Sequence, residues 1–291
     1  MELSILMPIN EKFLDVFDEF MNPEQKNKIR ANNVRQYVEG IIDLLLKNKI
    51  ESELKPTENY QNISWKKKLD ILENHYDKDI AITIREIFRI GGEGSHFKGE
   101  VSNEEIQGVI IQASHLVEDI FVKYFIEPEH QFGTENIYYF FSMLPLDNRI
   151  YILEHVYAQI KNIAVVDRLS LAYIKAGKDQ SAANLLKEAY AEQIIDKKFM
   201  EKQTEKLGIL RDNLSTVYEL NKDYDSNINS LKATMATESI AVVGLPTSKD
   251  VFDVKRAYDC FKPWFETYKD KYPEFINLFM CLMARDSREY N

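Results

Sequence analysis

The stretch Arg85-Glu-Ile-Phe-Arg89-Ile-Gly-Gly-Glu-Gly-Ser-His96-Phe97 sets the expected fold of the first half of the chain. Apolar residues at helical spacing lead into Arg89, which predicts a helix up to that point. Three glycines then fall within four positions and predict a break in the helix before His96. These glycines are Gly91, Gly92 and Gly94. A cation, a permissive backbone and an imidazole lie close together here, so we take this stretch as the candidate site.

The composition around this stretch predicts an all-α protein. The chain has 291 residues, of which only 10 are glycine and 8 are proline. Such scarcity favours helices joined by short connections, and apolar spacings of three and four recur along the chain. With 45% hydrophobic and 29% charged residues, the chain is expected to fold around a core. We predict a helical bundle over residues 1–130 and a helical-repeat domain over residues 131–291.

Cellular location is inferred from the segments that the sequence lacks. The first eight residues have neither the basic start nor the apolar run of a secretory signal, and no run of 18 apolar residues predicts a membrane span. The two cysteines, Cys260 and Cys281, have neither zinc-site nor disulfide-framework spacing. We therefore expect a cytoplasmic protein with reduced, buried cysteines.

The charge balance bears on nucleic-acid binding. Residues 1–130 contain 16 Lys and Arg against 24 Asp and Glu, hence −8, and residues 131–291 contain 21 against 23, hence −2. Neither half therefore matches a general nucleic-acid coat, which must neutralise many phosphates. The basic run Lys66-Lys67-Lys68 is interpreted as a solvated helix face.

Helix-start signals divide the first half into four or five helices. The pair Asn22-Pro23 predicts a cap followed by proline at the first helical position, with a helix running to about residue 50. Ser64 is predicted to cap the next long helix. Ser102 and Glu105 have the spacing of a capping box. Together these signals indicate an antiparallel bundle.

The second half has a different pattern. The spacing Leu169-x3-Tyr173-x3-Gly177-x4-Ala182-x3-Leu186-x2-Ala189 is that of a tetratricopeptide helix pair, and a weaker copy covers Leu214–Thr234. The copies are 45 residues apart, longer than the usual period of about 34, so an extended helix is expected between them. A last helix from Pro273 is expected to close the stack. We predict a short, irregular TPR-like domain.

The segment Phe88-Arg89-Ile90-Gly91-Gly92-Glu93-Gly94-Ser95-His96, between two helices of a bundle, resembles the Arg-x6-His junction of the HEPN superfamily. It is most similar to a bacterial subgroup whose junction reads Ile-Arg-x-Ile-Gly-Asn-x3-His. The resemblance covers about residues 20–127 and departs at Gly92, where that subgroup commonly has Asn. It includes the long helix that carries Arg35 and Glu39.

The resemblance implies RNA cleavage without a metal or other cofactor, by a homodimer that brings an Arg and a His from each chain to one cleft. His96 would transfer the proton of the RNA 2′-hydroxyl, because an imidazole titrates near neutrality. Arg89 would bind the phosphate with a planar fork of two hydrogen bonds. The implied substrate-binding residues are Gly91, Gly92, Gly94 and Ser95. The implied supporting residues are Glu93, Arg35 and Glu39.

The same resemblance implies a growth-arresting toxin or phage-defence effector, with a protein partner bound through the TPR-like half. Three alternatives stay open. Arg89 and His96 can instead tie a helix end to a loop, with the arginine bound to terminal carbonyls. The protein can also be a non-catalytic adaptor that dimerises through its HEPN-like half, or a sensor of a small ligand.

Other chemistry-bearing residues are interpreted more simply. The remaining histidines have no metal-ligand spacing and are interpreted as structural or surface residues. They are His75, His115, His130 and His155. The aromatic run Tyr138–Phe141 is interpreted as contact between the two halves, with a partner surface as the alternative.

Overall fold

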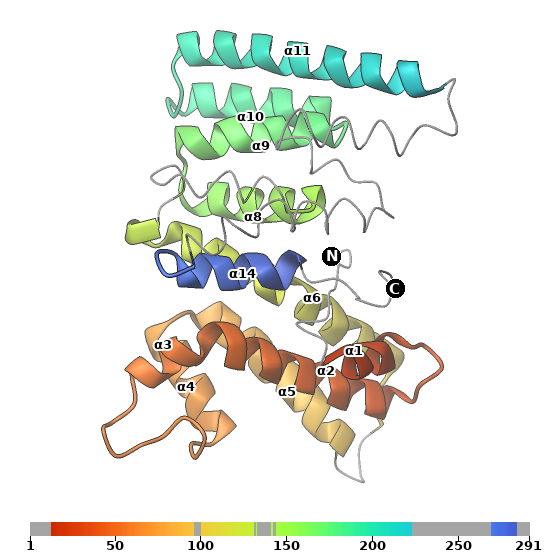
Figure 1. The fold of residues 1–291 in the computed structure, drawn as a ribbon, viewed down its shortest axis with the longest axis vertical. Helices are drawn as coiled ribbons and strands as arrows, with labels where there is room; N and C mark the ends of the chain where they lie inside the picture. Colours follow the sequence, from red (N-terminus) through yellow and green to blue (C-terminus); the bar gives the residue numbers. More distant parts are fainter. Residues whose placement is uncertain are drawn as a thin grey trace. The chain divides into compact units, whose positions relative to one another are not determined.

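The computed structural model describes residues 13–95, 100–130, 132, 141, 144–222 and 269–283. Within these ranges regular structure is entirely helical, so the all-α prediction is confirmed (Figure 1). No helix in the described part of the chain is both long and apolar enough to cross a membrane. His96, Tyr138–Phe140 and Cys260 lie outside the described residues, as does the second repeat copy beyond Lys222.

Packing divides the chain into two compact units. The first unit is Met1–Phe121 with Tyr272–Asn291, and the second is Val122–Lys271. The domain boundary that the sequence predicts at residue 130 stays a prediction. It describes two sequence modules, whereas the two units are defined by packing. Packing adds that the C-terminal segment groups with the first unit.

The first unit is built from helices that surround α2 and α5. Its elements are α1 (Leu14–Met21), α2 (Asn27–Ile41), the π-helical turn η2 (Ile42–Leu46), α3 (Lys47–Ser52), α4 (Trp65–His75), α5 (Lys78–Ser95), α6 (Asn103–Ile126) up to Phe121, and α14 (Pro273–Met283). Helix α2 packs against α1 and α5, and α5 also packs against α4. Their shared core is aliphatic and fully buried. It includes Val34, Val38, Ile41, Ile84 and Ile87.

Two predicted caps are confirmed. The backbone N–H of Lys67 donates to Ser64 Oγ (3.3 Å) at the start of α4. At the start of α6, the Glu105 N–H donates to Ser102 Oγ (3.1 Å) and the Ser102 N–H donates to Glu105 Oε2 (2.9 Å). Both caps satisfy donors that the first helical turn leaves without a partner, so residues three apart in sequence define these starts.

The predicted helix start at Asn22-Pro23 is wrong, since α2 begins at Asn27. Asn22 Oδ1 instead accepts from the backbone N–H of Glu24 (3.0 Å), which closes a local turn. The buried Arg30 then donates from Nε to the Phe20 carbonyl (2.9 Å) and ties α2 to the end of α1.

The C-terminal helix α14 begins at Pro273, as predicted. Its Phe275 ring packs edge-on against Phe121 at 5.5 Å between centroids, and Glu274 lies 3.6 Å from Lys49 Nζ. The helix expected to close the repeat stack thus packs in the first unit. Apolar spacing predicted the helix but could not identify its partner.

The second unit contains the end of α6, η3 (Pro128–His130), α8 (Leu146–Gln159), α9 (Ile163–Lys175), α10 (Asp179–Ala191) and α11 (Lys197–Lys222). Helices α8 to α11 form successive layers, and α9 packs against the other three (Figure 1). Asn162 caps α9, since its Oδ1 accepts from the Val165 N–H (2.9 Å). The turn to α10 requires a positive φ of 68° at Gly177, which glycine adopts readily. The predicted helix pair is therefore present, while its assignment to a tetratricopeptide repeat stays a prediction.

Candidate functional site

Helix α5 does not break at the glycines. It runs from Lys78 to Ser95, so the predicted break after Arg89 is wrong. Glycine inside a helix costs about 1 kcal/mol relative to alanine, and packing here offsets that cost. An ideal Cβ built on Gly91 would lie 2.7 Å from Arg35 Cβ and 3.0 Å from the Ala31 carbonyl oxygen, both on α2. Gly91 therefore permits a close approach of α2 and α5.

Arg35 belongs to the same helix contact. Its Nε donates to Glu39 Oε1 (2.9 Å), and its guanidinium carbon lies 5.0 Å from the Phe88 ring centroid. A Cβ on Gly92 would lie 3.8 Å from Arg35 Nη1, an ordinary contact distance. The structure thus brings together four residues that the sequence analysis assigned to the site. The contacts described for them are those of helix packing.

Arg89 lies on the surface of α5, and half of its side chain is exposed. Its Nε donates to Glu86 Oε2 (2.9 Å) and its Nη2 donates to Glu86 Oε1 (2.8 Å), so a carboxylate one turn earlier occupies the guanidinium fork. The hydrogen bonds from Arg89 lower the pKa of Glu86. Because the helix continues for six more residues, these contacts differ from the helix-end role considered above.

A shallow groove of about 570 Å³ runs beside Arg89 between α4 and α5. Arg85 in this groove donates from Nη2 to Asp70 (2.6 Å) and to Glu73 (2.8 Å), both on α4. These two carboxylates hold the guanidinium in place and raise its pKa. The groove is lined by Trp65, Lys66, Leu69, Ile82, Arg85, Glu86, Phe88 and Arg89.

The basic run beside this groove only partly forms the predicted solvated face. Lys66 is exposed, whereas Lys68 is buried. The Lys68 ammonium lies 3.6 Å from the ring centroid of Tyr60 and 4.1 Å from that of Trp65. Burial lowers its pKa. The prediction is wrong for Lys68 because cation–π contacts hold it between two rings.

The rest of the predicted site is only partly described. The backbone of Glu93, Gly94 and Ser95 forms the last turn of α5. His96 lies outside the described residues, so its distance from Arg89 is not part of this geometry. The roles expected for Glu93, Gly94, Ser95 and His96 therefore stay predictions.

Helix α6 contains a buried pair that the sequence analysis did not single out. His115 Nδ1 is hydrogen-bonded to Glu118 Oε2 at 2.6 Å, and the two side chains are 8% and 1% exposed. A spacing of three places both on one helix face, so His-x2-Glu was the available signal. Such deep burial suits a structural pair better than a site open to substrate.

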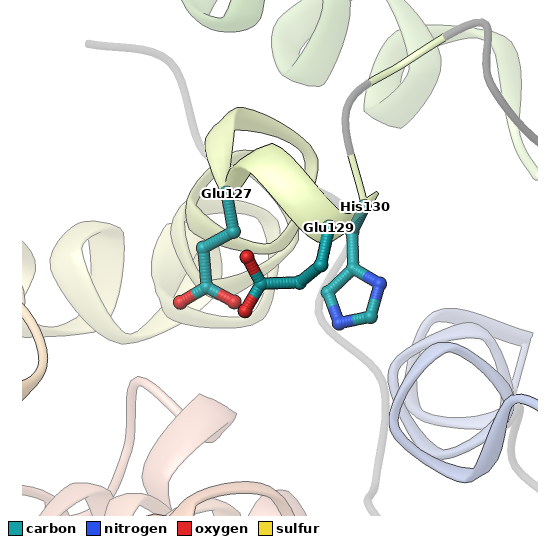
Figure 2. Close-up of side chains that lie close together, drawn as sticks. All are labelled: Glu127, Glu129 and His130. Atoms are coloured by element: carbon teal, nitrogen blue, oxygen red, sulfur yellow. The ribbon is translucent and has the colours of Figure 1, made fainter.

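One described cluster can hold a metal ion. Glu127, Glu129 and His130 place one possible ligand atom each within 4.8 Å of one another (Figure 2). The His130 ring stacks on Tyr124 at 4.2 Å between centroids, which fixes the imidazole next to the two carboxylates. Two carboxylates and an imidazole suit a divalent ion such as zinc or manganese. The sequence analysis missed this cluster because the turn at Pro128, not a helical spacing, brings the residues together.

Comparison with known proteins adds no relative: no family model, no curated protein and no solved structure matches the chain.

The groove beside Arg89 places this guanidinium and Glu86 near two aromatic side chains. A guanidinium fork fits phosphate as well as carboxylate, so a phosphate can compete with Glu86 for Arg89. The Trp65 and Phe88 rings meet edge to face at 5.2 Å between centroids and line the same groove.

Proposed function

We propose that the protein is a metal-independent endoribonuclease of HEPN type that acts in the cytoplasm as a homodimer. Arg89 binds the phosphate at the cleavage site, and His96 transfers the proton of the neighbouring 2′-hydroxyl. The observation that supports this proposal is the half-exposed guanidinium of Arg89 at a groove, held in a planar fork by Glu86.

The chemistry follows from the two residue types. The 2′-oxygen attacks the neighbouring phosphorus while the bond from phosphorus to the 5′-oxygen breaks, which leaves a 2′,3′-cyclic phosphate. His96 accepts the proton of the 2′-hydroxyl near pH 7, and an imidazolium in the shared cleft returns a proton to the leaving 5′-oxygen. Negative charge then develops on the phosphate oxygens, and the Arg89 fork stabilises it. Glu86 keeps the guanidinium oriented in the absence of RNA, and the phosphate takes its place when RNA binds.

This activity implies control, because an unregulated ribonuclease harms its own cell. We propose that the protein is a growth-arresting toxin or phage-defence effector, and that its TPR-like half binds the protein partner that restrains or recruits it.

The second candidate is a non-catalytic adaptor that dimerises through its first half. The Arg89–Glu86 pair favours it, because a carboxylate already neutralises the guanidinium. The formal charge of −8 in residues 1–130 also opposes RNA binding.

Cleavage of mixed RNA in the presence of a chelator separates the two candidates. We expect Arg89→Ala and His96→Ala each to lower the cleavage rate by about 100-fold or more. Arg211→Ala is the matched control, since it removes an exposed arginine from α11, which does not line the groove. Equal cleavage by wild type and all variants, or none by wild type, would support the adaptor. A monomer by light scattering would contradict the shared site.

A further inference from the structure

The turn that follows α6 brings three possible metal ligands together. Helix α6 ends at Ile126, and the short helix η3 begins at Pro128. The backbone N–H of His130 donates to the Glu127 carbonyl (3.0 Å) and closes this turn. Glu127, Glu129 and His130 each place one possible ligand atom within 4.8 Å of the other two (Figure 2). Bonds from zinc to nitrogen and oxygen are about 2.0–2.2 Å long, which sets its ligand atoms roughly 3–4 Å apart. Small side-chain rotations therefore suffice for the three residues to share one ion.

Packing holds the imidazole of this cluster in place. The His130 ring stacks on Tyr124 of α6 with 4.2 Å between centroids and 9° between the ring planes. Tyr124 is itself buried, so the surface on which the imidazole rests is fixed by the core. A side chain that is ordered before its ligand arrives loses little conformational entropy on binding. The nitrogen ligand is therefore preorganised beside the two carboxylates.

Two other described histidines lie beside a carboxylate without forming such a cluster. His75 Nδ1 lies 3.3 Å from Glu53, and His115 Nδ1 lies 2.6 Å from Glu118. Within the described residues, neither pair gains a third possible metal ligand at this spacing. The third ligand distinguishes the turn after α6, because zinc sites commonly use three protein ligands and a water molecule.

The electrostatics of this turn favour a cation. Helix α6 has 24 residues, and the partial negative charge of its last carbonyls lies at the end where the cluster begins. Glu127 and Glu129 add two carboxylates at the same end of the helix, within 4.8 Å of each other. A divalent cation between them is attracted by both carboxylates and by the helix end. Ligating carboxylates are commonly hydrogen-bonded as well, so other contacts of the two glutamates are compatible with metal binding.

We propose that Glu127, Glu129 and His130 bind a zinc ion that joins the end of α6 to η3. An imidazole nitrogen with two carboxylate oxygens suits zinc better than calcium or magnesium, which prefer oxygen ligands alone. Zinc also binds such mixed sites more tightly than manganese does. Three protein ligands leave the fourth position of the ion to water. This site goes beyond the proposed ribonuclease activity, which uses no metal, and does not depend on it.

Isothermal titration of the full chain, after dialysis against a chelator, with zinc, manganese and calcium chlorides tests the proposal. We expect saturable zinc binding that is tighter than binding of manganese or calcium. Glu129→Gln and His130→Gln should each weaken zinc binding at least about tenfold, which corresponds to about 1.4 kcal/mol. His155→Gln is the matched control, because this exposed histidine also stacks on a tyrosine, Tyr151, at 4.0 Å but belongs to no described ligand cluster. Zinc should also raise the melting temperature of the wild type more than that of Glu129→Gln.

Several results would overturn the proposal. They are absence of saturable zinc binding, calcium binding tighter than zinc binding, unchanged zinc affinity in Glu129→Gln, and equal weakening by His155→Gln. Circular dichroism verifies that each variant is folded. If His130→Gln does not fold because its ring packs on Tyr124, the exposed Glu129 decides the test. Because metal binding is measured directly, the result is independent of whether the protein cleaves RNA.

Discussion

The basic side chains of the two units have different surroundings. In the groove of the first unit, Arg85 is bound by Asp70 and Glu73, and Arg89 by Glu86. In a pocket of the second unit, between α8, α9 and α11, basic groups from three helices line a shared cavity, and burial together with their charges lowers the pKa of Lys175. Exposed ion pairs stabilise the first surface only modestly, whereas burial of a lysine close to other cations carries an electrostatic cost. Sequence motifs pointed to the first region, whereas only the tertiary structure brings the basic groups of the second together.

The largest effect is expected from substitution of Arg89, because the role proposed for this residue depends on the planar geometry of its guanidinium. Arg89→Lys keeps the charge but loses the planar fork, so we expect the rate of RNA cleavage to fall by about 100-fold. Single-turnover cleavage in chelator measures it, with Arg211→Lys as the control. A rate within twofold of wild type would mean that charge alone matters at this position.

Alanine substitutions at Gly91 and Gly92 test whether these glycines serve helix packing or phosphate binding. Gly91→Ala forces a methyl group against α2 and should destabilise the protein by about 2 kcal/mol. Gly92→Ala has room and should stabilise the helix by about 0.5–1 kcal/mol. Urea unfolding gives both values. Unchanged stability with lost RNA cleavage in Gly91→Ala would assign this glycine to the substrate instead.

Substitution of Lys175 tests how much this lysine, with its lowered pKa, destabilises the folded protein. Its folded-state pKa, about 7, lies below its unfolded value. The resulting destabilisation is fully present below pH 7 and disappears as pH rises toward about 10.5, the ordinary lysine pKa. We therefore expect Lys175→Met to stabilise the protein by about 1 kcal/mol at pH 6 and by less at pH 9. Thermal unfolding at both pH values measures the change. A gain that grows with pH would contradict the depressed pKa.

The smallest effect is expected at Glu86. Its pKa is lowered by Arg89, so its contribution is present above the ordinary glutamate pKa and is lost as pH falls through the lower folded value. Because 43% of the Glu86 side chain is exposed, Glu86→Gln should cost no more than about 0.5 kcal/mol. Unfolding at pH 7 and pH 3 checks this. A larger loss of stability would show that the Arg89–Glu86 ion pair is too strong for a phosphate to displace Glu86 easily.

Local signals predicted much of the fold. Ser64, Ser102 and Glu105 act within one helical turn, so their hydrogen bonds can be recognised from spacing alone. Asn22 misled because the same side chain can cap a helix or close a turn, and here it closes a turn by accepting from the Glu24 N–H.

The candidate site was predicted less completely. Arg35 and Gly91 were assigned to it and do meet, but the glycine is explained by the close approach of α2. Lys68 was interpreted as solvated and is buried against two rings. The basic pocket could not be predicted, because Arg149 and Lys206 belong to different helices and share no motif.

The sequence by itself determined that this chain is helical and where several helices begin, because apolar periodicity and capping act over a few residues. Only the tertiary structure decided whether the glycines break α5 or let it approach α2, and which cations share a cavity. Both depend on side chains far apart in sequence, whose distances are set by helix packing.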